Sequence, residues 1–381
     1  MNVTDGVYGL SRRRKSRYTM FLAVLPSYRR TCVEYVRETL GDDVQFIVSD
    51  AHLDPTVKTG ISKEYYRRAK MWRLFSGRLF VQVSTSLAPL TSEAVILDLN
   101  PRSLSAWTLL IIRRILRRRT LVWGHIHPQA GPGSWTGRFR LLMRKLAHGT
   151  ISYTYEDRAK ALTDLPGAPV WVAPNALYRG ADMIPSAGKQ EGERTDVLYV
   201  GRFVPAKKLL LLLRGFALAS ADAPEMGLKL IGGGQDEPAM KSLADELGIT
   251  RKVEFCGWED DVSALRDAYQ SAFCTVSPGF AGLGLTQSLG FGVPMLVADR
   301  EKHSPEIELK ESGGVVWFAA DSPKSLADEI KLQWTRRHAL PNVALSEYTR
   351  ERYSAEAMAW GLISALRDEE PVLAEITKDL A

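Results

Sequence analysis

Short apolar runs alternate with amphipathic segments along the first half of this 381-residue chain. The apolar runs predict strands, and apolar residues that recur at helical spacing predict helices between them. The predicted strands are 18–25, 43–48, 94–99, 120–124, 150–153 and 170–173, and the predicted helices are 28–40, 103–118, 137–146 and 156–165. Residues 58–76 are basic and aromatic without a clear period, and we expect a loop with helical turns there.

The same alternation restarts after residues 181–194, a polar stretch without a period that we expect to be a linker. The predicted strands are 196–200, 227–231, 253–256, 273–277, 295–297 and 314–318. The predicted helices are 208–219, 238–247, 261–269, 285–291 and 323–334, and residues 346–366 form one final amphipathic helix. This alternation predicts an α/β fold with mostly parallel, doubly wound sheets. Two such sheets that face each other leave a cleft at the carboxyl ends of their strands, where ligands bind.

Composition is that of a soluble globular protein, because 45% of the residues are hydrophobic and 25% are charged. No run approaches the ~20 apolar residues that span a bilayer. The basic residues 12–15 and the apolar run after them imitate a secretory signal, but the run is short and leads into Pro26, so we expect a first strand. Cys32, Cys256 and Cys274 have no metal-type spacing, and we expect buried thiols in a reducing compartment.

Charge is distributed unevenly along the chain. Residues 1–185 contain 28 basic and 14 acidic residues, whereas residues 186–381 contain 22 and 30. Between residues 100 and 150 there are ten basic residues and no acidic one. The first half therefore favours an anionic partner, which could be a nucleic acid, a membrane surface or a phosphorylated substrate. A basic surface that is simply solvated is the alternative.

The helix predicted at 103–118 concentrates this charge. At about 100° per residue, one broad apolar face contains Leu109, Ile111, Ile112, Ile115 and Leu116. The opposite sector contains Arg113, Arg114, Arg117 and Arg118 together with Trp107 and Leu110. Tryptophan and leucine among exposed arginines are typical of an interfacial helix on anionic lipid, so Trp107 and the four arginines are candidate membrane contacts. A solvated face and a nucleic-acid surface remain alternatives, although no recognised nucleic-acid motif accompanies the charge.

Two glycine-containing segments of the second half are suited to a phosphorylated ligand. Residues 275–294, TVSPGFAGLGLTQSLGFGVP, predict a strand end, a glycine-rich turn and a helix whose free N–H groups suit a phosphate or sugar hydroxyls. In LYVGRFVPAKK, Arg202 and Lys207 lie in a loop before a helix, where two fixed cations suit a diphosphate. A turn that merely closes a strand–helix unit and a solvated pair of cations are the structural alternatives.

These segments occur in order with LIGGGQDE, ELGITRKVEFCGW and HSPEIELKESGGVVWF. Together they resemble the C-terminal domain of family-4 retaining glycosyltransferases, which have the GT-B architecture of two facing Rossmann-like domains. The resemblance covers about residues 196–330 motif by motif. It implies an acceptor-binding domain at 1–180, a linker at 181–194, a nucleotide-sugar domain at 195–345 and a C-terminal helix at 346–381 that crosses back to the first domain. It also implies retention of configuration and a nucleotide diphosphate sugar as co-substrate, with no metal.

The resemblance also implies roles for individual residues. Arg202 and Lys207 match the diphosphate-binding pair, and Glu306 matches a proline–glutamate step before a donor-side helix. Asn175 matches the asparagine where the chain leaves the first domain. The remaining matches to donor-binding positions are Gly232, Gly233, Gly257, Trp258, Phe280, Gly282 and Leu283.

Two positions depart from the family pattern. The family usually has glutamates eight positions apart, the first associated with the transferred sugar and the second with the donor ribose; here these positions are Gly279 and Gln287. Gln287 can still hydrogen-bond ribose hydroxyls, whereas Gly279 has no side chain to replace a carboxylate. The chain is similar instead to a branch of glycosyltransferases with an SPG-x-x-GL pattern, so both positions stay among the candidate donor contacts.

In the first half, His125 and His127 follow a predicted strand end and face the presumed cleft. Alternate residues of an extended segment point in opposite directions, so one of the two faces the ligand. The resemblance favours His125 as the catalytic residue that touches the transferred sugar, and a structural role is the alternative. No cysteine or carboxylate lies at ligand spacing, so we expect no metal. Tyr28, Arg29 and His127 are candidate acceptor contacts.

The sequence thus predicts a cytoplasmic glycosyltransferase associated peripherally with the inner face of a membrane. Its partners would be a nucleotide sugar donor, a saccharide or lipid-linked acceptor and an anionic membrane surface, with no nucleic acid. Two alternatives remain open: a nucleotide-sugar epimerase of the same architecture, and a catalytically inactive sugar-nucleotide-binding module, which Gly279 and Gln287 suggest.

Overall fold

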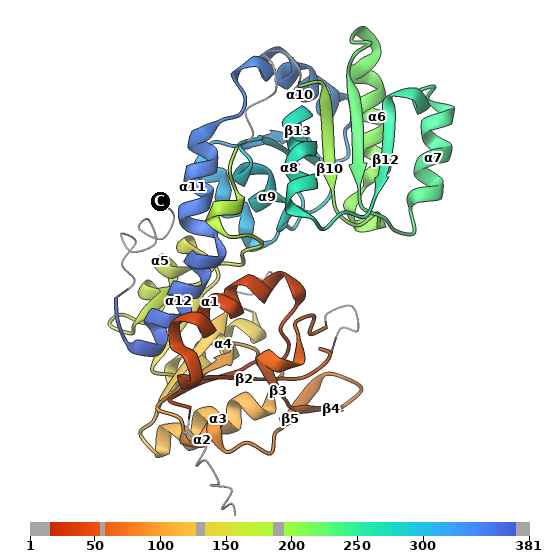
Figure 1. Cartoon of the computed structure of the whole chain (residues 1–381). Helices are drawn as coiled ribbons and strands as arrows, with labels where there is room; N and C mark the ends of the chain where they lie inside the picture. Colours follow the sequence, from red (N-terminus) through yellow and green to blue (C-terminus); the bar gives the residue numbers. More distant parts are fainter. Residues whose placement is uncertain (1–15, 54–57, 127–133, 186–193, 371–381) are drawn as a thin grey trace, which may run out of the picture.

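The computed structural model describes residues 16–53, 58–126, 134–185 and 194–370 and contains two parallel sheets (Figure 1). The first sheet has seven strands in the order β3-β2-β1-β6-β7-β8-β9, and every neighbouring pair is parallel. Its strands are β1 (Tyr18–Phe21), β2 (Val44–Val48), β3 (Tyr66–Arg68), β6 (Ala94–Asp98), β7 (Arg119–Gly124), β8 (Gly149–Ser152) and β9 (Val170–Val172).

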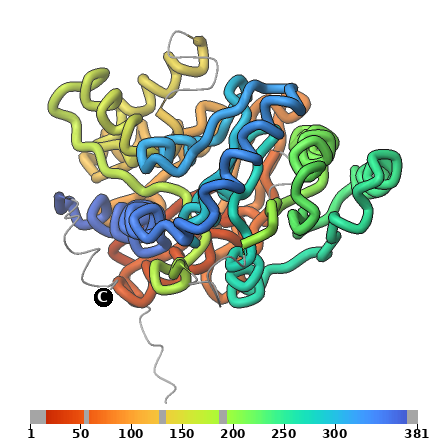
Figure 2. The backbone as a smooth tube through the Cα atoms, turned by 90° about the horizontal axis from the view of Figure 1, so that it is seen from above, coloured from red at the N-terminus to blue at the C-terminus, as the bar shows by residue number. Residues whose placement is uncertain are grey.

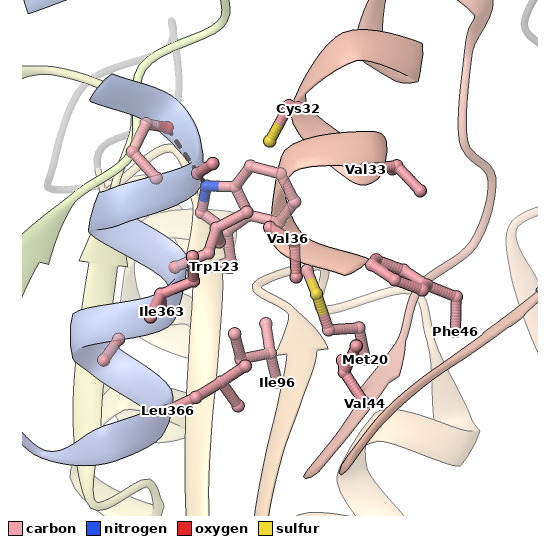
Figure 3. Packing of buried hydrophobic residues seen from close by; sticks show 14 of the residues in the cluster. Met20, Cys32, Val33, Val36, Val44, Phe46, Ile96, Trp123, Ile363 and Leu366 are labelled. Atoms are coloured by element: carbon pink, nitrogen blue, oxygen red, sulfur yellow. Dashed lines mark hydrogen bonds between the residues drawn. The ribbon is translucent and has the colours of Figure 1, made fainter. Parts of the chain in front are cut away.

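Helices cover both faces of this sheet because its buried strands are apolar on both sides. On one face lie α1 (Arg30–Leu40) and α12 (Ala355–Arg367), which pack on residues such as Trp123 and Ile96 (Figure 3). On the other face lie α3 (Leu104–Ile115), α4 (Trp135–Leu146) and α5 (Tyr155–Asp164). The short helix α2 (Ala88–Thr91) precedes β6. The last described helix therefore completes the core of the first domain, and α12 lies beside α1 in two views (Figure 1, Figure 2).

The second sheet has six parallel strands in the order β12-β11-β10-β13-β14-β15. They are β10 (Asp196–Val200), β11 (Gly227–Ile231), β12 (Val253–Gly257), β13 (Ala272–Ser277), β14 (Met295–Ala298) and β15 (Val315–Phe318). One face carries α6 (Leu209–Ala219), α7 (Glu237–Glu246) and α10 (Pro323–Arg336); the other carries α8 (Val262–Ser271), α9 (Gly284–Gly290) and α11 (Val343–Tyr353). The predicted fold class, two mostly parallel Rossmann-like units, is confirmed.

Three local expectations are wrong. Residues 58–76 contain the expected helical turn at Lys63–Tyr65, but the rest is not a loop: it contains strand β3 and the first arm of an antiparallel hairpin, β4 (Lys70–Leu74) and β5 (Leu79–Val83). The tail is two helices, because the chain is extended at Ser354, whose hydroxyl accepts from the Ala357 N–H and caps α12. Cys256 is exposed on the edge strand β12, whereas Cys32 and Cys274 are buried.

Most of the predicted linker lies outside the described residues. The domain boundaries at 180, 194 and 345 stay predictions. Within the described part of the chain, no helix has the length and apolar character needed to cross a bilayer.

Candidate functional site

The turns that follow β10 and β11 are locked together by their backbones. Gly201 donates to the Ile231 carbonyl oxygen at 2.9 Å, and Phe203 donates to that of Gly233 at 2.8 Å. A Cβ atom on Gly232 would collide with the Gly201 carbonyl oxygen, so this close approach requires glycine. A Cβ atom on Gly233, by contrast, would meet nothing within 4 Å. The two carboxyl-end turns therefore form one rigid rim with open space at Gly233.

The glycine-rich segment after β13 rests on the loop that contains Lys207. A Cβ atom on Gly279 would collide with the carbonyl oxygen of Ala206. Lys207 Nζ donates to the Phe280 carbonyl oxygen at 2.8 Å and lies 3.6 Å from the centre of the Phe280 ring. A glutamate at position 279 thus has no room while these two segments touch, which gives a physical reason for the departure from the family pattern.

Lys207 is a partly desolvated cation. Burial, together with the nearby positive charge of Arg202, lowers its pKa to about 8, and Glu306 opposes that shift. Arg202 is exposed at the carboxyl end of β10. Burial removes part of the water around this ammonium group, and one carbonyl oxygen replaces it only in part. An anion bound beside the group would stabilise its positive charge, so the site is suited to an anionic ligand.

His303 holds the glycine-rich segment from the other side, and the sequence reasoning missed it. Its Nδ1 accepts from the Ala281 N–H at 3.0 Å, so its Nε2–H donates to the Ala298 carbonyl oxygen at 2.9 Å. Ser304 N–H donates in turn to the Ala281 carbonyl oxygen. Burial lowers the pKa of His303, which agrees with a neutral ring. The HSPE motif pointed to this segment, but the sequence did not show that His303 contacts the glycine-rich segment.

A hydrogen-bonded chain of three side chains joins the two domains. Arg29 donates to Asn175 Oδ1 at 3.1 Å and to the Tyr153 hydroxyl at 2.9 Å. Asn175 Nδ2 donates to Glu306 Oε1 at 3.2 Å. Arg29 and Glu306 are 7% and 3% exposed, so this chain lies inside the protein, and Arg29 also stacks over the Trp123 ring at 4.3 Å. Arg29 is therefore placed at the domain junction rather than on an open acceptor loop.

His125 follows β7 at the carboxyl edge of the first sheet, as predicted. Its ring lies 4.9 Å from the Tyr153 ring, and burial together with the charges of Arg140 and Arg29 lowers its pKa to about 4. The ring is therefore neutral at physiological pH. Arg140 was not a candidate; its Nε and Nη1 atoms are buried and have no partner among the residues that the structure describes. Tyr28 is half-buried beside Arg29, and His127 lies outside the described residues.

The other predicted donor contacts are distributed around the same rim. Gln287 is buried in α9, and its amide donates to the Tyr178 hydroxyl at 2.7 Å, so a ribose contact stays a prediction. Gly257 has a φ of 76° and is followed by Trp258, whose side chain is exposed. Gly282 and Leu283 lead into α9, and a Cβ atom on Gly282 would lie 3.2 Å from Ser304 Oγ.

The predicted exposed arginine sector of α3 is wrong in part. Arg113 is fully buried, and Leu110 is buried beside it. Trp107 is half-buried and its indole N–H donates to the Pro101 carbonyl oxygen. Arg114, Arg117 and Arg118 are exposed. Compared with the prediction, α3 is thus rotated about its own axis, and part of the apolar face that was predicted for it is exposed to solvent.

Chemically, the second domain presents a rim of close-packed turns with two cations, Arg202 and Lys207, above the carboxyl ends of its strands. In open α/β sheets this is where ligands bind, and the charge favours an anionic one. The first domain contributes a neutral histidine and buried arginines. Among the described residues, no group of three or more histidine, cysteine, aspartate or glutamate side chains could hold a metal ion.

Comparisons with known proteins agree with this geometry. Residues 182–352 match the family model described as glycosyl transferases group 1. The lipopolysaccharide core biosynthesis glycosyltransferase LpsE of Rhizobium meliloti (strain 1021) is 28% identical over 134 residues, which are 35% of each chain. An uncharacterized glycosyltransferase of Haemophilus influenzae is 29% identical over 124 residues, 32% of this chain and 35% of that protein. The chain thus matches about a third of the length of these curated relatives.

Solved structures resemble most of the chain, including both domains. Anabaena Alr3699/HepE in complex with UDP has a TM-score of 0.65 at 12% identity, covering 92% of this chain and 100% of that one. The lipopolysaccharide outer core galactosyltransferase WaaB in its apo form has a TM-score of 0.62 at 14% identity, covering 92% and 99%. At such identities the likeness concerns the fold. The chain therefore has the two-domain GT-B fold, and its residues 182–352 match the glycosyl transferases group 1 family.

Proposed function

We propose that the protein transfers a sugar from a nucleotide diphosphate sugar to an acceptor hydroxyl. The observation that carries this proposal is the half-buried Lys207 ammonium, which reaches from the loop it shares with Arg202 to the glycine-rich segment at the carboxyl end of the second sheet. In the transfer, the bond between the sugar C1 and the diphosphate oxygen breaks, and a bond from C1 to the acceptor oxygen forms. The acceptor hydroxyl gives its proton to the departing diphosphate oxygen, so that the products are the glycosylated acceptor and the protonated nucleoside diphosphate.

Lys207 and Arg202 would stabilise the negative charge that develops on the departing diphosphate. Cations placed in advance where charge appears are among the strongest contributions to catalysis. The hydrogen-bonded turns at Gly201 and Gly232 would fix the position of the nucleotide, and the first domain would orient the acceptor. The proposal includes retention of configuration and no metal, since Arg202 and Lys207 would themselves neutralise the charge of the diphosphate.

His125 remains the candidate contact to the transferred sugar. A histidine whose pKa is about 4 is a weak base at physiological pH, because efficient acid–base groups titrate near the working pH. Its neutral ring is better suited to hydrogen-bond a sugar hydroxyl than to remove the acceptor proton. Arg140 joins it as a candidate for an anionic acceptor group, because two of its N–H groups are buried without a partner among the described residues.

The donor and acceptor classes are part of the same proposal. Structural neighbours solved with UDP and with UDP-glucose make uridine diphosphate sugars the first donors to test. Relatives named for lipopolysaccharide core synthesis favour a lipid-linked saccharide acceptor at the cytoplasmic inner face of a membrane.

An inactive sugar-nucleotide-binding module is the second candidate. It is favoured by Gly279, where a side chain has no room, and by Gln287, whose amide bonds Tyr178. Such a module would bind a nucleotide sugar without transferring or hydrolysing it. An epimerase, in contrast, would change the donor sugar without any acceptor.

A thermal-shift screen against nucleotide sugars tests the proposal, because a ligand that binds the folded state stabilises it by mass action. We expect one donor class to raise the Tm of the wild type. Lys208 supplies a matched control for Lys207, since its ammonium already pairs with Glu301 and Asp321. Lys208→Ala should keep the shift, and Lys207→Ala should lose it. No shift with any nucleotide sugar would contradict the proposal.

A further inference from the structure

Helices α3 and α4 leave large apolar side chains exposed on the first domain. On α3 these are Ile111, Ile112, Ile115 and Leu116, and on α4 they are Trp135 and Leu142. Ile115 and Trp135 are 75% and 73% exposed, far more than residues at the edge of a core. Isolated exposed apolar residues are ordinary, but a cluster on neighbouring elements marks an interaction site.

The two helices form one continuous surface. The Trp107 ring of α3 lies 6.1 Å from the Phe139 ring of α4, and Phe139 lies 4.7 Å from Trp135. In Figure 1, α3 lies at the lower edge of the first domain, away from the second domain. We name the six exposed apolar residues and the basic residues among them the α3–α4 surface. The α3 part of this surface therefore faces away from the second domain.

Arg113 explains why the isoleucines point outward. Its buried guanidinium donates to Thr120 Oγ1 and to four carbonyl oxygens, those of Pro89, Ser92, Glu93 and Arg119. All five N–H groups of the side chain can be satisfied in this way. Rotating α3 to bury its isoleucines would pull this charge out of its bonds. The helix is therefore held with an apolar face in solvent.

Unpaired positive charge surrounds these apolar residues. The exposed basic residues of the surface are Arg114, Arg117, Arg118, Arg138 and Lys145. Across the part of the chain that the structure describes, none of these five forms an ion pair. On α4, Trp135, Arg138, Leu142 and Lys145 follow one helical stripe, so apolar and basic side chains alternate on the same face.

We propose that the α3–α4 surface docks on an anionic lipid bilayer. The isoleucines and Trp135 would enter the boundary between headgroups and acyl chains, and the basic side chains would meet lipid phosphates. A second copy of the chain fits less well, because a two-fold contact would place the five cations of each copy against each other. Nucleic acid would meet the cations but leave the isoleucines in water. A bilayer satisfies both kinds of side chain.

Vesicle co-sedimentation of the full chain tests this inference without any glycosyl transfer, so its failure and that of the proposed function are distinguishable. Vesicles of phosphatidylcholine alone are compared with vesicles that also contain phosphatidylglycerol. We expect binding to the anionic vesicles and release at ~1 M salt, where charges are screened within about 3 Å. Ile111→Ser with Ile115→Ser should weaken binding about tenfold or more. Arg138→Ser with Lys145→Ser should weaken it about fivefold per charge.

The matched control is Arg214→Ser with Leu218→Ser, an exposed basic and apolar pair on α6 of the second domain. This variant should bind anionic vesicles as the wild type does. Because all the substituted residues are exposed, circular dichroism should show unchanged folding. The inference is overturned if the wild type ignores anionic lipid, or if both α3–α4 variants bind like the control. A wild-type dimer that Ile111→Ser with Ile115→Ser dissolves, without lipid binding, would assign the surface to a second copy instead.

Discussion

Asn175 donates a hydrogen bond to Glu306 at 3.2 Å, and this bond connects the loop that follows β9 to the second domain. The same amide accepts from Arg29, so one uncharged side chain separates a buried cation from a buried carboxylate. Burial raises the pKa of Glu306, and Arg29 and Lys207 oppose that shift. Glu306 therefore interacts electrostatically both with Arg29 at the domain junction and with Lys207 of the proposed donor site.

Asn175→Ala should destabilise the protein, because it leaves Arg29 and Glu306 buried with fewer partners. Each buried polar group that loses its partner costs about 1–3 kcal/mol. Urea unfolding measures the loss of unfolding free energy. Asn100→Ala is a suitable control, since Asn100 accepts a local bond from Arg102 within the first domain. Equal stabilities for the two variants would show that the interdomain chain contributes little.

Affinity for a nucleoside diphosphate should fall as pH rises above about 8, the pKa of Lys207. The diphosphate binds the protonated amine, so above this pH binding must also take up a proton, and affinity drops by up to about tenfold per pH unit. Titration calorimetry in buffers of different ionisation enthalpy measures that uptake. Lys208→Ala should retain the pH dependence and Lys207→Ala should abolish it. A pH-independent affinity in the wild type would place the diphosphate away from Lys207.

Gly279→Ala should destabilise the protein by about 1–3 kcal/mol, as expected for overpacking. The added Cβ atom would collide with the Ala206 carbonyl oxygen and push the glycine-rich segment away from the Lys207 loop. Gly233→Ala is the control, because a Cβ atom there meets nothing within 4 Å. Thermal unfolding of both variants measures their stabilities, and only Gly279→Ala should have a lower Tm than the wild type. A Gly279→Glu variant that is both stable and more active would contradict the steric account.

Arg113→Met should lower the unfolding free energy by about 3 kcal/mol or more, because four buried or partly buried carbonyl oxygens and the Thr120 hydroxyl lose a donor at once. Its neighbour Arg114 is exposed, so Arg114→Met should change the unfolding free energy by less than about 0.5 kcal/mol. Chemical denaturation of the two variants measures the difference between their free energies of unfolding. If both substitutions are equally mild, Arg113 does not fix the orientation of α3.

The sheet and helix order could be predicted from the sequence because each buried strand is a short apolar run between amphipathic segments. The hairpin β4–β5 could not, since several of its side chains are exposed on both faces and its turn at Phe75–Gly77 depends on positive φ angles. Where apolar and polar residues do not alternate along a segment, the sequence lacks the period of two residues by which an exposed strand is recognised.

The position of Arg202 and Lys207 after the carboxyl end of β10 could be predicted, because their loop has a recognisable motif. The Arg29–Asn175–Glu306 chain could not, because residues more than a hundred positions apart meet there. The role of His303 could not either, because it depends on how the glycine-rich segment folds back against the histidine ring. Arg113 was misplaced for a related reason: a helical projection treats every arginine as exposed, and the carbonyl groups that bury this one come from α2 and its neighbours. Pairings of this kind belong to the tertiary structure.

The central claim is that Lys207 stabilises the diphosphate of a nucleotide sugar during transfer. The most direct measurement follows product formation from the donor that the thermal-shift screen identifies, using wild type, Lys207→Ala and Lys208→Ala. We expect Lys208→Ala to stay active and folded Lys207→Ala to lose about 100-fold or more in turnover, as when a preorganised transition-state contact is removed. Near-normal turnover in Lys207→Ala would contradict the account.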